Sequence, residues 1–270
     1  MIVLPAKIIL FAIFGAFLTG IACSLVGSFV VRMNLSSLGF CMSHAAFAGA
    51  ALGLLLSFNP LVIAIIFSVL VAFILGPIAE KAKLDTNVVI GILFSLTISL
   101  GLIFLSFSPG TAMSSTALSI LWGSILGITI NDILRLTVIT FSIILIIVLF
   151  FKEFQAIMFS RKMAEASGIN TKPFYYLILF LTGITVALSL KLVGGLLVFA
   201  LMINPASSAY QFFYDMKKIT IFSPIIGVFC CFLGILLSFF LDLPTGSSIA
   251  ITSSLFFGIS VLISPKRKRG

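Results

Sequence analysis

The sequence predicts an all-α integral membrane protein, a polytopic helical bundle with about nine spans. Three observations lead to this fold class. The mean hydropathy is +1.34, and 61% of the 270 residues are hydrophobic while only 9% are charged. Apolar runs long enough to cross a bilayer, about 20 residues each, recur along the whole chain. The alternating apolar and polar segments of an outer-membrane barrel do not occur in it.

Nine runs approach or exceed that length, and short polar loops separate them. In chain order they are residues 8–31, 40–58, 61–80, 88–107, 132–151, 174–190, 192–212, 219–241 and 247–263. The first run follows only Lys7 and has no short apolar region before a small-residue cleavage site, so we expect a span there and no cleaved signal. Residues 114–128 form a shorter apolar segment, which we expect to be re-entrant or to lie at the outer surface.

The net charge of +9 is explained by membrane topology and does not require a nucleic-acid partner, because the basic residues lie in short loops between apolar runs. With nine spans and the N-terminus outside, 13 of the 16 Lys and Arg residues are cytoplasmic, including the tail at 266–269. A tenth span at 114–128 with the N-terminus inside leaves 11 of 16 there. We therefore expect nine spans in the plasma (inner) membrane and a cytoplasmic C-terminus.

The chain is expected to form a single transmembrane domain of residues 1–270, without a catalytic domain. The longest polar interval, 152–172, is too short to form a core, and the chain has no G-x-x-x-x-G-K-[ST] phosphate loop. ATP, if it drives transport, must therefore bind a partner subunit. The four cysteines all lie in apolar runs without a C-x-x-C motif, and the simplest expectation is that they pack as small hydrophobic residues. They are Cys23, Cys41, Cys230 and Cys231.

The only histidine, His44, lies near the start of the second run. Ionisable groups are costly inside a bilayer, so His44 must face protein or water and is a candidate functional residue. Ala45, Gly49 and Gly53 repeat every four residues on the same helix and allow close helix packing. Cys41 lies on the same side as His44, and the pair could offer sulfur and nitrogen to a cation such as Zn²⁺. The alternative is that His44 makes one interhelical hydrogen bond and Cys41 only packs.

A second polar interruption falls in the seventh run. Pro205 cannot donate to the carbonyl of Leu201, so we expect the helix to be kinked or opened there, with the amide of Asn204 offered to cargo at the break. The competing expectation is a plain proline kink whose free carbonyl is satisfied by Ser207 or Ser208.

Two carboxylates lie beside helix starts. Asp242, in the last loop, is either a cation-attracting group at the outer entrance or the N-terminal cap of the final helix. Asp85 is expected to be a simple helix cap on the cytoplasmic side.

The polar interval after the fifth run predicts a short surface helix beginning at Arg161 and stopped by Gly168. Met163 and the preceding Phe159 fall on one side at helical spacing, together with Ala166. Charged residues cover the other sides; they are Arg161, Lys162 and Glu165. So short a helix needs a docking surface, and the alternative is a solvated connector held at the bilayer by charge.

Six segments in this order resemble the permease subunits of the zinc/manganese ABC importers (ABC-3 type). They are residues 26–33, 39–45, 85–92, 165–168, 193–209 and 242–246. The resemblance implies a homodimeric permease that receives a divalent metal from an extracellular or periplasmic metal-binding protein and couples to two cytoplasmic ATPase subunits. It also implies that residues 161–169 are the coupling helix that docks on the ATPase, with Arg161, Lys162, Met163, Glu165 and Gly168 as its key residues.

His44 matches the histidine of the family's Gly-Asp-x-x-x-His motif, but Phe40 stands where the family has aspartate. The hard oxygen ligand is therefore missing, and Cys41 as a local substitute would favour zinc-like over manganese-like ions. We expect an ATP-dependent importer of a divalent metal, most of all zinc, that binds no cofactor itself. One alternative is a stand-alone secondary transporter or channel that uses His44 as an ion or proton relay. Another is that the cargo has become a metal chelate or other small solute.

Overall fold

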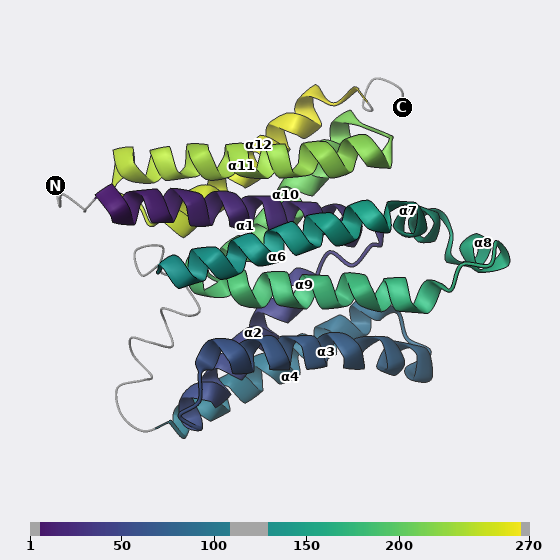
Figure 1. Cartoon of the computed structure of the whole chain (residues 1–270), viewed down its shortest axis with the longest axis horizontal. Helices are drawn as coiled ribbons and strands as arrows, with labels where there is room; N and C mark the ends of the chain where they lie inside the picture. Colours follow the sequence, from purple (N-terminus) through teal and green to yellow (C-terminus); the bar gives the residue numbers. More distant parts are fainter. Residues whose placement is uncertain (1–5, 109–128, 266–270) are drawn as a thin grey trace.

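The computed structural model describes residues 6–108 and 129–265. Within them lie eleven helices and no strand, so the all-α class is confirmed (Figure 1). The expected segment at 114–128 lies outside the described residues. The helices are α1 (Ala6–Arg32), α2 (Leu38–Leu55), α3 (Pro60–Ala82), α4 (Thr86–Ser106), α6 (Ile130–Leu149), α7 (Phe151–Phe159), α8 (Arg161–Ala166), α9 (Thr171–Val193), α10 (Gly195–Phe212), α11 (Met216–Leu241) and α12 (Thr245–Ile263).

Among the described helices, eight are long and apolar enough to cross a membrane: α1, α2, α3, α4, α6, α9, α11 and α12. They correspond to eight of the nine expected spans. The ninth expected span coincides with α10, whose second half contains Asn204, Pro205 and Gln211. α10 packs against α1, α11 and α12, with Pro205 buried and Asn204 and Gln211 half-buried.

The long helices form two groups with α9 between them. One group contains α2, α3 and α4, and the other contains α1, α10, α11 and α12. Figure 1 shows α2, α3 and α4 along one side of the molecule and α1, α11 and α12 along the other. α9 contacts α3 and α2 on one side and α1 on the other, while α6 packs on α1.

Small residues allow helix backbones to touch at several of these contacts. A Cβ placed on Gly27 of α1 would lie 1.9 Å from the carbonyl oxygen of Met202 on α10, and one placed on Gly49 of α2 would lie 2.6 Å from the carbonyl oxygen of Ile63 on α3. Close backbone approach through small residues is a principal source of packing energy between spanning helices. The small-residue face predicted on α2 is therefore a packing face.

The two acidic residues expected at helix starts have different outcomes. Asp85 accepts a hydrogen bond from the backbone N–H of Asn87 at 2.8 Å and caps α4, as predicted. The N-cap prediction for Asp242 was wrong, because Asp242 ends α11 in a left-handed conformation (φ 51°) and Pro244 precedes the first residue of α12. The backbone N–H of Asp242 donates to the carbonyl of Ser238, which completes the last turn of α11.

Candidate functional site

α2 places His44 beside two phenylalanine rings, and a third ring lies against one of them. The imidazole centroid lies 4.9 Å from the ring of Phe40 and 4.8 Å from the ring of Phe94, both in edge-to-face geometry. Phe40 stacks on Phe94 at 5.0 Å and meets Phe199 edge-to-face at 5.5 Å. We call Phe40, Phe94, Phe199 and His44 the aromatic cluster.

The aromatic cluster joins the two helix groups. Phe40 and His44 lie on α2 and Phe94 on α4, all in the first group, whereas Phe199 belongs to α10 in the second. Nearby, the hydroxyl of Ser43 lies 3.4 Å from the carbonyl of Gly195, so α2 also contacts the first turn of α10. A relative movement of the groups would therefore change the surroundings of His44.

His44 does not make the interhelical hydrogen bond considered from the sequence. It is half-buried, and its Nδ1 atom is buried without a hydrogen-bond partner among the described residues. Polar atoms in that position are uncommon in folded proteins and require an explanation. Phe40 accounts for part of it, because a phenyl ring fills the position from which a carboxylate could accept a hydrogen bond.

Cys41 is fully buried in the main hydrophobic core. The described part of the chain contains no group of three or more His, Cys, Asp or Glu side chains arranged to hold a metal ion. Zn²⁺ takes about four ligands and Mn²⁺ prefers a larger oxygen-rich set. Of the four side chains of the aromatic cluster, only His44 carries an atom that can bind a metal ion.

The side chain of Asn204 is hydrogen-bonded to α12, a helix that carries no residue of the aromatic cluster. Its side-chain amide donates to the hydroxyl of Ser253 at 3.0 Å and to that of Ser254 at 2.9 Å, so it ties α10 to α12. Asp242 lies in the α11–α12 turn, a loop distinct from the elements that carry the aromatic cluster. The hydrogen bonds of the Asn204 side chain therefore connect it to α12 and not to His44.

The prediction that Pro205 opens the helix was wrong, because α10 continues through it. Pro205 has no backbone N–H to donate to the carbonyl of Leu201. That carbonyl instead accepts a hydrogen bond from the hydroxyl of Ser24 on α1 at 3.0 Å. The alternative involving Ser208 was also wrong in its detail, since Ser208 donates to the carbonyl of Asn204. The interruption comes earlier, at Gly194, whose positive φ of 79° separates α9 from α10.

The short surface helix predicted in the polar interval is present as α8. The Ser160 hydroxyl accepts from the N–H of Met163 at its start. Gly168 ends it with φ 83°, donating to the carbonyl of Glu165, while the N–H of Ile169 donates to the carbonyl of Ala164. This pair of bonds is the Schellman motif, which glycine favours. Gly168 thus ends α8 and turns the chain towards α9.

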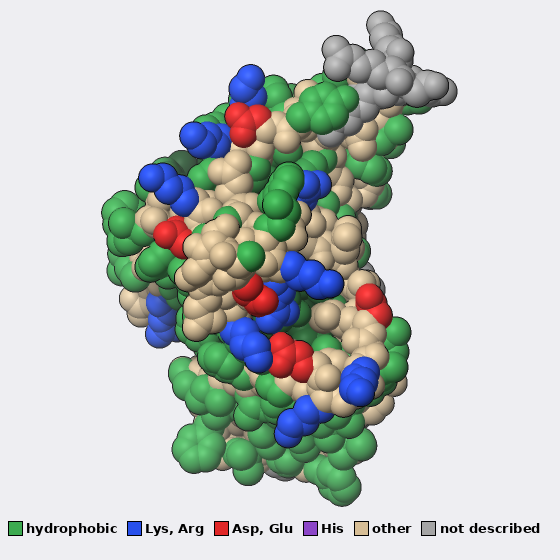
Figure 2. Space-filling view, turned by 90° about the vertical axis from the view of Figure 1, so that its right-hand side faces the viewer, with side chains coloured by type: hydrophobic (Ala, Val, Ile, Leu, Met, Phe, Trp, Pro, Cys, Tyr) green, Lys and Arg blue, Asp and Glu red, His purple; other side chains and the backbone are tan. Residues whose placement is uncertain are grey.

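The α7–α8 segment exposes large apolar side chains next to charged ones. Phe159 is 75% exposed and Met163 is 60% exposed, and Lys162 is also exposed. Figure 2 faces the end of the molecule where α7 and α8 lie, and Lys, Arg, Asp and Glu side chains gather there. The segment therefore presents two large apolar side chains within a charged face.

Arg161 and Glu165 instead hold α8 to the rest of the bundle. The Arg161 guanidinium lies 3.5 Å from Glu80 of α3 and 3.5 Å from Glu165, and its Nε donates to the Thr171 hydroxyl at 3.1 Å. Thr171 also donates to Glu165, and Lys172 pairs with Glu80 at 3.4 Å. Sequence reasoning missed Glu80, because it lies 81 residues from Arg161 in the chain.

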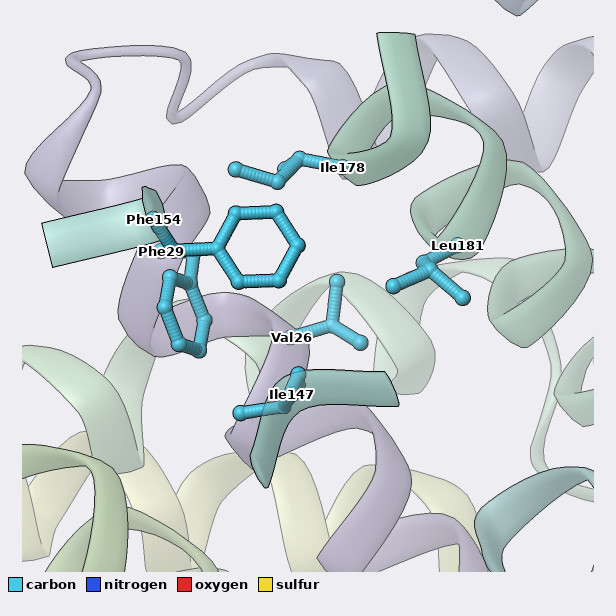
Figure 3. A pocket seen from close by; sticks show the side chains of 6 residues that line it. All are labelled: Val26, Phe29, Ile147, Phe154, Ile178 and Leu181. Carbon is cyan, nitrogen blue, oxygen red and sulfur yellow. The ribbon is translucent and has the colours of Figure 1, made fainter. Parts of the chain in front are cut away.

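Phe154 anchors α7 in the bundle. Its ring is fully buried and meets Phe29 of α1 at 5.4 Å and Phe174 of α9 at 5.8 Å, both edge-to-face. Figure 3 shows the small apolar cavity beside it, which is lined by Val26, Phe29, Ile147, Phe154, Ile178 and Leu181. These residues come from α1, α6, α7 and α9, so the cavity beside Phe154 lies where α7 meets three other helices.

The bundle of helices long and apolar enough to cross a membrane places the chain among polytopic membrane proteins. The model of the ABC 3 transport family matches residues 6–264. The chain belongs to this family, as the six sequence segments predicted. Its relatives are membrane subunits of transport systems, and the chain itself is not an enzyme.

Two relatives illustrate the range of named cargo. The chain is 33% identical over 250 residues to the manganese transport system membrane protein MntC of Listeria monocytogenes, covering 92% of this chain and 88% of that one. It is 28% identical over 261 residues to the high-affinity zinc uptake system membrane protein ZnuB of Haemophilus influenzae, covering 95% and 98%. Among solved structures, PsaBC from Streptococcus pneumoniae in complex with Fab matches with a TM-score of 0.85 and 31% identity, covering 97% of this chain and 93% of that chain.

Proposed function

We propose that this chain is the permease subunit of an ATP-driven importer of divalent metal ions, with zinc as its principal cargo. The observation that carries the proposal is the position of His44, the only histidine, within a chain of the ABC 3 transport family. Relatives named for manganese and for zinc support metal as the cargo class.

Zinc is favoured over manganese by the chemistry around His44. Mn²⁺ prefers oxygen ligands, and Phe40 occupies the position where an aspartate would supply one. Imidazole is a good ligand for Zn²⁺. Cys41, Asn204 and Asp242 remain secondary candidates, because each would have to change its present surroundings before it could contribute a donor to the same ion.

The proposed partners are two ATPase subunits, a second copy of the permease and an extracellular or periplasmic metal-binding protein. The exposed side chains of Phe159 and Met163 support ATPase docking at α7–α8, because exposed apolar groups rimmed by charge are typical of protein interfaces. Lys162 lies on the same exposed segment. We propose that this end is cytoplasmic, because basic residues of several loops gather there (Figure 2), and nothing in the proposal involves nucleic acid.

The decisive experiment is uptake by proteoliposomes that contain the permease with its ATPase and binding protein. We expect ATP-dependent accumulation of Zn²⁺ that exceeds accumulation of Mn²⁺ when each is supplied at the same concentration. Metal uptake by the permease alone, without ATPase or ATP, would instead establish the secondary transporter or channel.

The docking surface has its own test. Met163→Asp should prevent co-purification of the ATPase or abolish metal-stimulated hydrolysis, because it places a charge in the apolar contact. Leu84→Asp is the matched control: Leu84 is also an exposed apolar residue, in the short connection from α3 to α4. Equal loss of ATPase binding in both variants would contradict docking at α8.

A further inference from the structure

The contacts of α8 with the spanning helices converge on one carboxylate. Glu80, in the last turn of α3, lies 3.5 Å from Arg161 of α8 and 3.4 Å from Lys172 of α9. Both of its oxygens are used, since Oε1 faces Arg161 and Oε2 faces Lys172. Glu80 therefore joins the surface helix to α3 and α9 at a single point.

Arg161 has several partners that fix its position, so it can connect α8 to Glu80. Besides Glu80 it contacts Glu165 and Thr171, and its guanidinium lies 5.5 Å from the ring centroid of Tyr175. A single exposed ion pair contributes little, but several partners that fix one planar guanidinium restrict its geometry. Movement of α8 must consequently displace Glu80 or break these contacts.

From Glu80 the path to His44 runs through tightly packed backbone. α3 contacts α2 at Gly49 and Gly53, where an added Cβ would lie 2.6 Å and 2.8 Å from atoms of α3. Closer to Glu80 along α3, the Ser68 hydroxyl lies 3.7 Å from the sulfur of Met42 on α2. Packed helices without slack move as units, so α2 should follow α3.

We propose that Glu80 is the positioning residue through which movement of α8 reaches α3 and, through α3, the helix that carries His44. This inference rests on the proposed function, since it names the route by which ATP-driven movement would reach the aromatic cluster. Phe154 packs against Phe29 of α1 and Phe174 of α9. α7 is therefore attached to α1 and α9 by Phe154, whereas α8 is attached to α3 by the pair of Arg161 and Glu80.

The test compares Glu80→Gln with Asp85→Asn in the reconstituted complex. Both substitutions remove one negative charge from the same end of the bundle, and asparagine preserves the cap of α4. We expect Glu80→Gln to assemble normally and to hydrolyse ATP, but to transport at least about fivefold less Zn²⁺ per ATP hydrolysed. Asp85→Asn should keep the wild-type ratio. An unchanged ratio in Glu80→Gln, an equal fall in both variants, or failure of Glu80→Gln to assemble would each overturn the proposal.

A double-mutant cycle identifies the partner. If Glu80 acts through Arg161, the double variant Glu80→Gln with Arg161→Gln should have the same transport ratio as Arg161→Gln alone. Losses that multiply in the double variant would show that the two residues act independently and would contradict the route.

A readout that needs no cargo separates this inference from the proposed function. A spin label on Leu56→Cys, at the far end of α2, should change its distance to the label on the second permease copy when nucleotide is trapped. Glu80→Gln should reduce that change, and Asp85→Asn should not. This result in a complex that imports neither Zn²⁺ nor Mn²⁺ would reject the metal assignment but support the route, whereas an undiminished change in Glu80→Gln would reject the route.

Discussion

The hydroxyl of Ser24 on α1 donates to the carbonyl of Leu201 on α10 at 3.0 Å, and this is the carbonyl that Pro205 leaves without its helical donor. A proline at membrane depth is tolerated where a neighbouring helix supplies the missing hydrogen bond. The contact therefore lets α10 remain continuous through Pro205 and ties it to α1.

Ser24→Ala should lower the free energy of unfolding by about 1 kcal/mol, because it leaves a buried carbonyl unpaired in an apolar environment. Thermal unfolding in detergent, compared with Ser99→Ala, measures the loss. Ser99 is exposed and bonds only to its own helix, at the carbonyl of Ser95, so its replacement should leave stability nearly unchanged. Equal stability of the two variants would mean that another group satisfies Leu201.

Gly27→Ala should be among the most damaging single-methyl changes in the chain, because the new Cβ would lie 1.9 Å from the backbone carbonyl of Met202. Overpacking of this kind costs about 1–3 kcal/mol, and backbone cannot move aside as a side chain can. Gly91→Ala and Gly258→Ala are the controls, since an added Cβ at either position meets no atom within 4 Å. Yield of folded protein and unfolding temperature should fall only in the Gly27 variant.

Phe154→Ala should destabilise the attachment of α7 by about 3 kcal/mol, since it empties a fully buried site next to an existing apolar cavity. Phe159→Ala removes the same side chain from an exposed position on the same helix. Hydrogen exchange of the α7 backbone in the isolated permease should increase in the first variant only. Similar exchange in both would contradict the anchoring role of Phe154.

His44→Ala should abolish metal uptake while leaving membrane insertion and yield intact, because a small apolar residue suits the Ala/Gly-rich helix α2. Uptake and thermal unfolding measured on the same preparation separate a loss of function from a loss of fold. Wild-type uptake by this variant would establish His44 as a packing residue.

Phe40→Asp should shift the cargo profile towards Mn²⁺, because a carboxylate one helical turn before His44 supplies the oxygen ligand that the aromatic cluster lacks. Cys41→Ser should selectively weaken Zn²⁺ uptake if the helix rotates to present its sulfur. Competition between Zn²⁺ and Mn²⁺ in the uptake assay checks both. An unchanged ion profile in both variants would place the selecting site elsewhere.

Features that depend on local sequence could be predicted well, and those that depend on distant partners could not. The end of α8 at Gly168 and the cap at Asp85 need only neighbouring residues, and both predictions were confirmed. The consequence of Pro205 was missed because its compensating donor lies 177 residues from the acceptor. The N-cap expectation for Asp242 failed because Asp242 ends α11, and Pro244 precedes the first residue of α12.

The candidate site divides in the same way. His44 could be selected from composition alone, as a single ionisable side chain within an apolar run. Its surroundings could not be predicted, because Phe94 and Phe199 come from α4 and α10 and meet Phe40 only after these helices pack against α2. Arg161 could be selected from the charge pattern of the short surface helix. Its partner Glu80 could not be predicted, because the two residues meet only in the tertiary fold.

The four native thiols, at Cys23, Cys41, Cys230 and Cys231, all have zero solvent exposure. A thiol reagent added to folded protein should therefore react with an introduced surface cysteine long before it reaches any native one. The chain can be mapped from either side of the bilayer with a membrane-impermeant maleimide and single substitutions such as Lys162→Cys and Leu56→Cys, without first replacing the natural cysteines. Labelling of intact cells would then reveal directly which face of the bundle meets the cytoplasm.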